Sequence, residues 1–274
     1  MVAEDLTGGD RRRAVTPGRR SGPRRSTDPK RPAGPESDRA NRVRRSYAAW
    51  ARVYDWFARA TASVGGVRAG CVDALGLEAG DTVVEFGCGS GANLPALREA
   101  VGPEGRVVGV DLTPAMLDRA SGLVERRGWE NVSLVCGDAT DPPVRSVDGV
   151  LATFVTSLFP DPYAVVSEWC ELASDVVVAG FAPGSNRAAN AGLWAFARLN
   201  GRLFDAGSRD PLDRLAERTA ASCRALEDRL SAVERERRLF GTISVCAGHR
   251  IGDGGAGGSG GDRSRNAPPA ERNV

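Results

Sequence analysis

Residues 82–93 read Thr-Val-Val-Glu-Phe-Gly-Cys-Gly-Ser-Gly-Ala-Asn. The first five are apolar or β-branched except for Glu85, a composition that predicts a buried strand. Glycines then occupy alternate positions, at Gly87, Gly89 and Gly91. Glycine allows the backbone to turn sharply and to approach a ligand closely, and the N-terminus of a following helix offers free N–H groups. This run therefore predicts a strand, a ligand-binding loop and a helix, in that order.

Short Val-rich runs alternate with helical patterns on both sides of this stretch. Strands are expected at residues 82–86, 107–110, 132–136, 147–154 and 176–179. Helices are expected between them, near residues 93–101, 114–127 and 162–172. A polar helix near 211–230 then leads into a closing pair of strands at 232–240 and 241–247. The alternation predicts an α/β fold: a doubly wound, mostly parallel, seven-stranded sheet with helices on both faces.

Two of the expected helices have a recognisable start. Thr113-Pro114 and Asp161-Pro162 each place a residue with a capping side chain before a proline. Proline suits the first helical position because its missing N–H would have no partner there. We therefore expect Thr113 and Asp161 to cap helices.

Three acidic residues lie at or near the ends of the first three predicted strands. Glu85 lies two positions before the first glycine, where it can reach a ligand ammonium group. Asp111 lies 20 residues beyond Gly91, the spacing expected of a carboxylate that binds ribose hydroxyls. Asp138 follows the third strand and can accept a hydrogen bond from an adenine amino group. An amino acid, a ribose and an adenine together predict S-adenosylmethionine as the ligand.

Two other functions fit parts of the pattern. Gly87-x-Gly89-x-x-Ala92 also satisfies the dinucleotide fingerprint, which makes an NAD-dependent dehydrogenase the third hypothesis. Glu85 sits poorly beside a pyrophosphate, however, because both are negatively charged. The second hypothesis is a non-catalytic S-adenosylmethionine-binding sensor or interaction module.

Residues 82–154 resemble the cofactor half of class I S-adenosylmethionine-dependent methyltransferases. The E-x-G-x-G-x-G run, the aspartate after the second strand and the Gly-Asp-Ala loop at 137–139 occur in the order of that family. The resemblance implies a Rossmann-like methyltransferase fold, methyltransferase activity and S-adenosylmethionine as cofactor. The cofactor-binding residues that it implies are Glu85, Gly87, Gly89, Gly91, Asn93, Asp111, Leu112, Asp138, Ala139 and Thr153.

Three further segments resemble bacterial phospholipid N-methyltransferases and the related ubiquinone/menaquinone C-methyltransferases. They are residues 47–55, 89–95 and 157–162. The resemblance covers roughly residues 46–180 and implies a small-molecule or lipid acceptor, such as a phospholipid amine or a quinone-like molecule. Two segments depart from the family pattern: residues 171–175 replace a longer basic turn, and residues 188–204 have no counterpart.

The expected chemistry needs few catalytic groups. Methyl transfer from a sulfonium is an in-line displacement, so the protein mainly has to hold the nucleophile and the methyl carbon about 3–3.5 Å apart. The chain has one histidine, His249, and no cysteine cluster with the spacing of a metal site, so we expect neither an imidazole base nor a metal. Tyr47 and Tyr54 are the preferred catalytic candidates, and Asp55 and Asp161 are further ones.

Residues 46–60 predict an amphipathic helix. Its aromatic residues recur at three- and four-residue steps and form one stripe: Tyr47, Trp50, Tyr54 and Phe57. One interpretation is a lid packed over the cofactor. The other is an interfacial helix, with aromatic rings among lipid headgroups and its arginines toward anionic lipid. A second apolar stretch lies at 193–199, and we expect substrate-side helices across 185–230.

The two ends of the chain differ from its centre in composition. Residues 1–45 carry 13 Lys and Arg against 6 Asp and Glu, whereas the remaining 229 residues carry 24 and 29. Because residues 1–45 have almost no aliphatic periodicity, we expect a disordered arginine-rich tail, either a basic arm or a dispensable extension. Residues 251–274 are Gly-rich and are expected to be disordered as well. One methyltransferase domain is therefore expected at 46–250.

The cysteine pattern and the hydropathy bear on the cellular environment. The six cysteines are scattered without a C-x-x-C pair, which argues against a disulfide framework and favours a reducing cytoplasm. No stretch approaches the ~18 apolar residues of a membrane span. We therefore expect a cytoplasmic protein without a nucleic-acid partner, with peripheral contact at the inner, anionic membrane face through residues 1–60. The sequence does not indicate an oligomeric state.

Overall fold

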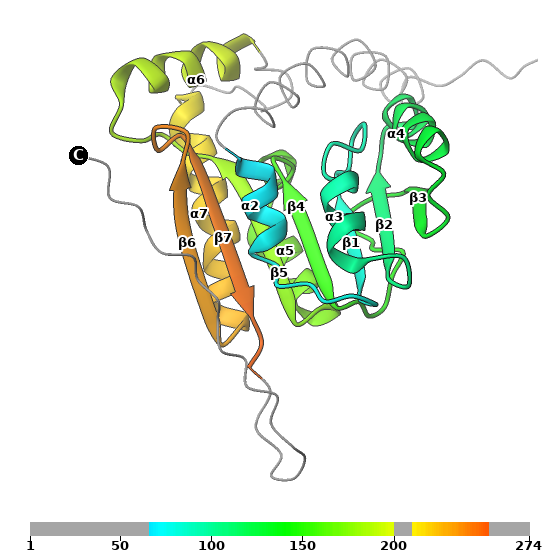
Figure 1. Cartoon of the computed structure of the whole chain (residues 1–274). Helices are drawn as coiled ribbons and strands as arrows, with labels where there is room; N and C mark the ends of the chain where they lie inside the picture. The colour runs from blue at the N-terminus through cyan, green and yellow to red at the C-terminus, as the bar shows by residue number, and fades with distance from the viewer. Residues whose placement is uncertain (1–65, 200–209, 252–274) are drawn as a thin grey trace, which may run out of the picture. The chain divides into compact units, whose positions relative to one another are not determined.

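The computed structural model describes residues 66–199 and 210–251. Seven strands of this part form one sheet with the order β3-β2-β1-β4-β5-β7-β6 (Figure 1). They are β1 (Thr82–Phe86), β2 (Arg106–Asp111), β3 (Val132–Cys136), β4 (Gly149–Thr153), β5 (Asp175–Phe181), β6 (Ala232–Arg238) and β7 (Ile243–His249). Strands β1 to β5 run parallel, and β7 is antiparallel to both β5 and β6. This confirms the predicted doubly wound, mostly parallel sheet and its closing pair of strands.

The helices lie between the strands in the chain. They are α2 (Val67–Asp73), α3 (Leu94–Val101), α4 (Pro114–Arg127), the 3-10 helix η1 (Thr156–Leu158), α5 (Pro162–Leu172), α6 (Arg187–Leu199) and α7 (Pro211–Arg229). Helices α3, α4, α5 and α7 agree with the predicted bounds to within one residue. Helix α2 was not predicted, because seven residues that include Gly70 are too few to show helical periodicity. Several predictions lie outside the described residues. They concern the helix at 46–60 with Tyr47 and Tyr54, the tail before Ser46 and the tail beyond Ile251.

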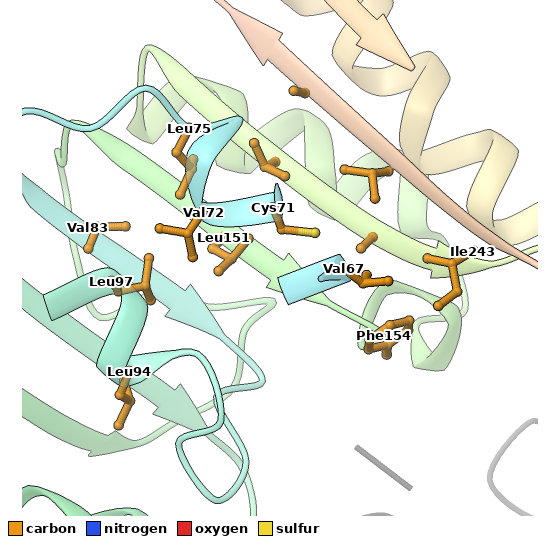
Figure 2. Packing of buried hydrophobic residues seen from close by; sticks show 14 of the residues in the cluster. Val67, Cys71, Val72, Leu75, Val83, Leu94, Leu97, Leu151, Phe154 and Ile243 are labelled. Carbon is orange, nitrogen blue, oxygen red and sulfur yellow. The ribbon is translucent and has the colours of Figure 1, made fainter. Parts of the chain in front are cut away.

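Apolar side chains fill both faces of the sheet. Successive residues of a strand point to opposite faces, so Val83 belongs to the cluster that contains α2 and α3, whereas Val84 belongs to the cluster that contains α5 and α7. Figure 2 shows Val72 of α2 and Leu97 of α3 in the first cluster. Burial on both faces explains why the parallel strands are apolar almost throughout. None of the helices in the described ranges is long and apolar enough to cross a membrane.

The topology brings three polar strand ends together. Strand β1 pairs with β2 on one side and with β4 on the other, and all three run parallel, so their carboxyl ends share one edge of the sheet. The chain moves outward from β1 through β2 to β3 and then returns to β4, which makes β1 the point where the strand order reverses. Open α/β sheets bind ligands at such a point. Glu85, Asp111 and Thr153 all lie at this edge.

One of the two predicted helix caps is present. The Asp161 side chain accepts a hydrogen bond of 3.0 Å from the Ala164 backbone N–H and so caps α5. The prediction for Thr113 was wrong, because its side chain makes no cap hydrogen bond to α4. The backbone N–H of Thr113 instead donates to the Asp111 carboxylate at 2.8 Å, so this helix start is held by the strand end before it.

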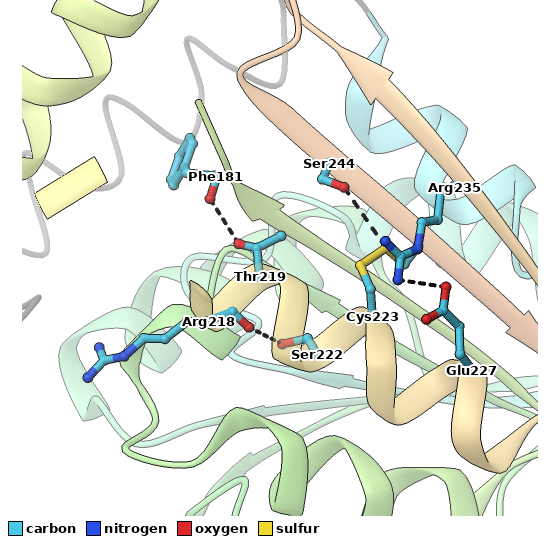
Figure 3. Close-up of a disulfide and its surroundings, with 9 residues drawn as sticks. Phe181, Arg218, Thr219, Ser222, Cys223, Glu227, Arg235 and Ser244 are labelled. Atoms are coloured by element: carbon cyan, nitrogen blue, oxygen red, sulfur yellow. Dashed lines mark hydrogen bonds and ion pairs between the residues drawn. A yellow bond between two sulfur atoms is a disulfide. The ribbon is translucent and has the colours of Figure 1, made fainter. Parts of the chain in front are cut away.

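The prediction that the cysteines form no disulfide framework was wrong for one pair. Cys223 of α7 and Cys246 of β7 form a disulfide, with their Cα atoms 5.8 Å apart (Figure 3). The sequence argued against disulfides because no pair has a recognisable spacing, but a helix and a strand 23 residues apart meet only in the tertiary structure. Both cysteines are buried. The bond therefore links α7 covalently to the sheet on the face that α5 and α7 cover.

This disulfide should stabilise the fold measurably. A disulfide that closes a loop of this length lowers the conformational entropy of the unfolded chain, which raises the free energy of unfolding by about 3 kcal/mol. Dithiothreitol should therefore lower the midpoint of thermal unfolding of the wild-type protein, while a Cys223→Ala/Cys246→Ala variant should show no response to the reductant. Thiol titration of the denatured, unreduced protein should find the four remaining cysteines, which are Cys71, Cys88, Cys136 and Cys170. Six titratable thiols in that sample would contradict the bond.

Candidate cofactor site

The glycine loop after β1 uses its glycines for two different purposes. Gly87 has a φ of 70°, and a Cβ built there would lie 2.8 Å from the Cβ of Val155, so its side is packed against protein. Gly89 has a φ of 55°, and a Cβ there would meet nothing within 4 Å. Gly91, also at positive φ, is buried against Leu94. Gly89 is thus the position of the loop that faces open space, where a ligand can approach the backbone closely.

Four side chains, from α2, β1, β4 and the loop before α3, form a buried polar network beneath the glycines. Asn93, just before α3, donates through Nδ2 to Glu85 Oε1 at 2.5 Å and to Thr153 Oγ1 at 3.0 Å. Arg68 of α2 donates through Nη1 to Asn93 Oδ1 at 2.8 Å and to Thr153 Oγ1 at 3.3 Å. All four side chains are at most 8% exposed. The network holds Glu85 in one orientation at the end of β1.

Strand parity explains how these residues meet. Glu85 follows Val83 by two positions, and Thr153 follows Leu151 by two, so both polar side chains share the face of the sheet that packs on α2 and α3. Asn93 does not cap α3 with its side chain, which is directed instead to Glu85 and Thr153. The network therefore requires three segments of the chain and cannot be deduced from local sequence.

One oxygen of Glu85 is left for a ligand. Oε2 is buried and has no hydrogen-bond partner among the described residues. Burial raises the pKa of Glu85 to about 8, against the opposing effects of the Arg68 guanidinium and the Asn93 amide, and the Asp111 charge raises it further. A buried carboxyl oxygen without a partner is costly, because the charged form lacks its solvation. An ammonium group is the partner that removes this cost, so Glu85 fits the amino group of a bound amino acid.

Asp111 closes the glycine loop from the neighbouring strand. Its Oδ2 accepts from the Gly89 backbone N–H at 2.9 Å, and its Oδ1 accepts from the Thr113 N–H at 2.8 Å. Burial raises the pKa of Asp111, and these two backbone donors oppose the rise. Each carboxylate oxygen has a second lone pair available. The arrangement fits a carboxylate that accepts from two vicinal hydroxyls, and Leu112 beside it is 65% exposed, as a surface for a flat apolar group would be.

The third carboxylate lies in a loop with two anchors. Asp138 is exposed, and its Oδ1 accepts from the Thr140 backbone N–H at 2.9 Å and from Thr140 Oγ1 at 2.8 Å. The next residue, Ala139, accepts through its carbonyl a hydrogen bond of 2.9 Å from the Trp169 indole. Trp169 is fully buried and stacks on Phe86 with ring centroids 4.8 Å apart. The loop is thereby held on the α5 face while Asp138 Oδ2 stays outside these bonds.

Arg68 is the site residue that the sequence did not reveal. It lies on the unpredicted helix α2 and is 8% exposed, although arginine is rarely buried without a partner. Its guanidinium also lies 5.8 Å from the ring centroid of Phe154. In the sequence, the only indication of its role was that it is a single charged residue within the otherwise uncharged run Val67–Val72. Its hydrogen bonds to Asn93 and Thr153 explain why it is buried there.

The chain leaves β4 in an unusual conformation next to the network. Phe154 has a φ of 63°, which a bulky residue adopts only when the surrounding structure enforces it. Its backbone N–H donates to the Ala179 carbonyl at 2.7 Å, and its ring stacks on Phe181 at 4.6 Å. The strained residue directs the next segment, with Val155, against Gly87.

The structure gives no catalytic base among the candidates that it describes. Asp161 is engaged in capping α5. His249 lies at the other end of the sheet, where its Nδ1 is 2.7 Å from Asp175 Oδ1. Among residues 66–199 and 210–251 no group of three or more His, Cys, Asp or Glu side chains is placed to hold a metal ion. The candidates Tyr47, Tyr54 and Asp55 lie outside the described residues and stay predictions.

Known proteins match the part of the chain that carries this site. The sequence family described as a methyltransferase domain matches residues 83–175. Phosphatidylethanolamine N-methyltransferase of Cereibacter sphaeroides is 37% identical over 143 residues, which cover 50% of this chain and 66% of that protein. Aklanonic acid methyltransferase DauC of Streptomyces sp. (strain C5) is 35% identical over 95 residues, 34% of this chain and 43% of that protein. The chain thus spans less than half the length of the first curated relatives that it matches.

Solved structures show the same fold. A methyltransferase in complex with the Haloferax volcanii Trm112 methyltransferase activator superimposes with a TM-score of 0.52 at 19% identity, covering 74% of this chain and 96% of that one. An O-methyltransferase family protein from Burkholderia thailandensis gives 0.51 at 16% identity, over 77% and 60% of the two chains. The fold and the methyltransferase domain matched at residues 83–175 agree with the resemblance of residues 82–154 to S-adenosylmethionine-dependent methyltransferases.

Proposed function

We propose that the protein transfers a methyl group from S-adenosylmethionine to a small-molecule or lipid acceptor. The observation that carries the proposal is the buried Oε2 of Glu85, which has no hydrogen-bond partner in the described part of the chain and lies at the strand-order reversal next to Asp111. A dinucleotide would bring an anionic pyrophosphate to this loop and would disfavour the ionised form of Glu85 further, whereas an ammonium group favours it. The matched methyltransferase domain over residues 83–175 supports the same reading.

The residues have separate proposed tasks. Glu85 binds the ammonium group of the amino-acid moiety, and Arg68 and Asn93 hold Glu85 in place. Asp111 accepts from the ribose hydroxyls, while the open side of Gly89 admits the ligand to the backbone. When bound, S-adenosylmethionine supplies an electrophilic methyl group on a sulfonium. The chain's contribution to catalysis is to position it against the acceptor.

The adenine end of the cofactor is assigned to the neighbouring loops. Asp138 accepts from the adenine amino group, and Leu112 and Ala139 line the ring. Support comes from the exposure of Leu112 and from the Trp169 hydrogen bond that fixes the Ala139 carbonyl. In this assignment the cofactor extends across the carboxyl ends of β1, β2 and β3.

The acceptor is proposed from the relatives and from the sequence pattern. The relatives include enzymes named for phosphatidylethanolamine, demethylmenaquinone and aklanonic acid. We propose an acceptor of that kind, with Tyr47 and Tyr54 of the predicted helix at 46–60 contacting it. Helix α6, which follows the carboxyl end of β5, would also line the acceptor site. The domain limits 46–250 and the membrane contact through residues 1–60 belong to the same proposal.

A methyl-transfer assay tests the function. The purified protein is incubated with methyl-labelled S-adenosylmethionine and with separate lipid and water-soluble metabolite fractions. Label should appear in one acceptor fraction, and an Asp111→Ala variant should transfer none. Binding of S-adenosylmethionine without transfer to any fraction would favour the sensor hypothesis, and binding of nicotinamide dinucleotides in its place would favour the dehydrogenase.

A further inference from the structure

Helix α6 presents an exposed face without acidic residues. Leu193 and Ala197 are buried against the core, while the opposite side of the helix is exposed. Its exposed residues are Arg187, Ala188, Ala191, Gly192, Trp194, Ala195 and Arg198. Trp194 is 43% exposed, an unusual position for the largest apolar side chain. At 100° per residue, Arg187, Trp194 and Arg198 fall on one line along the helix.

The turn between β6 and β7 adds a second exposed aromatic residue. Phe240 is 72% exposed and has a φ of 55°, which a bulky residue rarely adopts. Arg237 braces the turn, since its Nη1 donates to the carbonyls of Gly241 and Pro183 at 3.0 and 3.1 Å. The backbone of the turn thus holds Phe240 outward instead of letting it fold onto the protein.

The turn and the helix form one fixed surface. A Cβ at Gly184 would lie 2.8 Å from the Gly241 backbone, so the turn packs directly on the segment before α6. Asn190 of α6 clamps the same glycine: its Oδ1 accepts from the Gly184 N–H at 2.9 Å, and its Nδ2 donates to the Gly184 carbonyl at 2.8 Å. Figure 1 shows the β6–β7 turn beside α6. We call Arg187, Trp194, Arg198, Arg237 and Phe240 the α6–turn surface.

This surface lies at the same end of the sheet as the cofactor site, which is the end where the parallel strands have their carboxyl termini. Strand β7 is antiparallel to β5 and begins opposite Phe181, the last residue of β5, so the β6–β7 turn lies at the carboxyl ends of the parallel strands. Glu85, Asp111 and Thr153 mark that edge in β1, β2 and β4. A partner bound by the α6–turn surface therefore approaches the protein from the side on which the acceptor must enter.

The charge of the surface selects its partner. Arg187 and Arg198 form no ion pair within the described part of the chain, and α6 carries no carboxylate to neutralise them. Arg237 bonds only to carbonyl oxygens, which leave its charge in place. Exposed aromatic rings, together with arginines that form no ion pair among the described residues, on two adjoining segments are the combination that binds the headgroup region of an anionic bilayer.

We propose that the α6–turn surface docks the protein onto an anionic phospholipid bilayer. Trp194 and Phe240 enter the headgroup region, and the arginines contact lipid phosphates. The proposal adds a second contact to the predicted one through residues 1–60, on residues for which the structure gives positions. Only the purpose of this docking rests on the proposed function: it would bring a lipid or lipid-soluble acceptor to the end of the sheet that carries the cofactor site.

Vesicle co-sedimentation of the full chain tests the proposal. The wild-type protein should bind equimolar phosphatidylcholine–phosphatidylglycerol vesicles at low salt and bind pure phosphatidylcholine weakly. Arg187→Glu/Arg198→Glu should reduce the partition coefficient by about 30-fold or more, because each arginine near an anionic surface is worth on the order of 1 kcal/mol. Trp194→Ala/Phe240→Ala should reduce it by a similar factor. Both variants change exposed side chains, so their unfolding midpoints should stay near that of the wild type.

Matched controls come from the opposite edge of the sheet. Ile251 is 67% exposed just after β7, and Arg106 is exposed at the start of β2, so both lie at the amino ends of the parallel strands. Ile251→Ala and Arg106→Glu should leave vesicle binding unchanged. Equal losses in these controls, or wild-type levels of binding in both surface variants, would overturn the proposal, as would a wild-type protein that ignores anionic vesicles.

Two further readouts separate the possible failures. Every variant should bind S-adenosylmethionine with wild-type affinity in calorimetry, since none of the changed residues belongs to the cofactor network. Loss of vesicle binding with cofactor binding intact would be the supporting result. If the wild-type protein binds vesicles but not S-adenosylmethionine, the proposed function fails and the surface stands. If the surface variants change the oligomeric state instead of the vesicle binding, the surface contacts a second copy and the proposal is wrong.

Discussion

Asp111→Ala should weaken S-adenosylmethionine binding by at least about 100-fold, because the variant loses the two proposed hydrogen bonds from ribose hydroxyls to a charged acceptor. Each such bond is worth about 1.5–3 kcal/mol. The same carboxylate holds the backbone N–H groups of Gly89 and Thr113, so its removal also loosens the loop that the ligand contacts. Isothermal titration calorimetry measures the change directly.

Two variants make this result interpretable. Asp111→Asn keeps one oxygen acceptor without the charge and should lie between the wild type and the alanine variant. Glu104→Ala removes a carboxylate that is exposed at the opposite edge of the sheet and should leave the affinity unchanged. The unfolding midpoint of each variant is measured alongside. An Asp111→Ala protein that is folded and binds with wild-type affinity would refute the site.

Binding of S-adenosylmethionine should depend on pH through Glu85. Burial raises the pKa of Glu85 to about 8, so the carboxyl group is mostly protonated below that pH in the ligand-free protein. An ammonium ligand needs the ionised form, and binding then releases one proton. The association constant should therefore rise by up to about tenfold per pH unit as the pH increases toward 8. Above pH 8 it should fall again as the ligand's α-amino group, with an ordinary pKa of about 7.7–8.0, loses its charge.

Glu85→Gln separates this effect from other titrations. The variant cannot ionise, so it should bind weakly and should lose the rise of affinity between pH 6 and pH 8. Because burial also raises the pKa of Asp111, some pH dependence at lower pH can persist in the variant. Calorimetry in buffers of different ionisation enthalpy counts the protons released. A wild-type protein that releases none at pH 7 would show that Glu85 is already ionised and would contradict the prediction.

The sign of this linkage also affects the ligand-free fold. A carboxyl group whose pKa is raised on folding contributes stability below its unfolded pKa of about 4.5, and that contribution is lost as the pH rises through about 8. As the pH rises toward 8, Glu85 therefore destabilises the ligand-free fold, while the affinity for the ammonium ligand increases. Glu85 has the properties of a group placed for binding, since burial disfavours its charge in the ligand-free fold despite the opposing effects of Arg68 and Asn93.

Local sequence was sufficient for most of the helices and strands and for the positions of three carboxylates at or near strand ends. The strands at 82–86 and 132–136 and the helices at 114–127 and 162–172 have the predicted bounds, because buried strands and amphipathic helices carry their own periodicity. The glycine spacing after β1 predicted a tight loop between a strand and a helix, and the structure has one there. It did not distinguish the packed side of Gly87 from the open side of Gly89, which depends on the distant residue Val155.

Long-range contacts decided the rest. Arg68 contacts the site only through the packing of α2 against α3 and β4, since its partners Asn93 and Thr153 lie 25 and 85 residues away. The disulfide between Cys223 and Cys246 and the packing of the β6–β7 turn on Gly184 likewise depend on which surfaces pack together. Periodicity and turn chemistry act between neighbours in the chain, so the sequence by itself determined the fold class and the carboxylates at the strand ends. The buried hydrogen-bond network, the covalent link and the exposed α6–turn surface arise from packing between distant segments, and only the tertiary structure decided them.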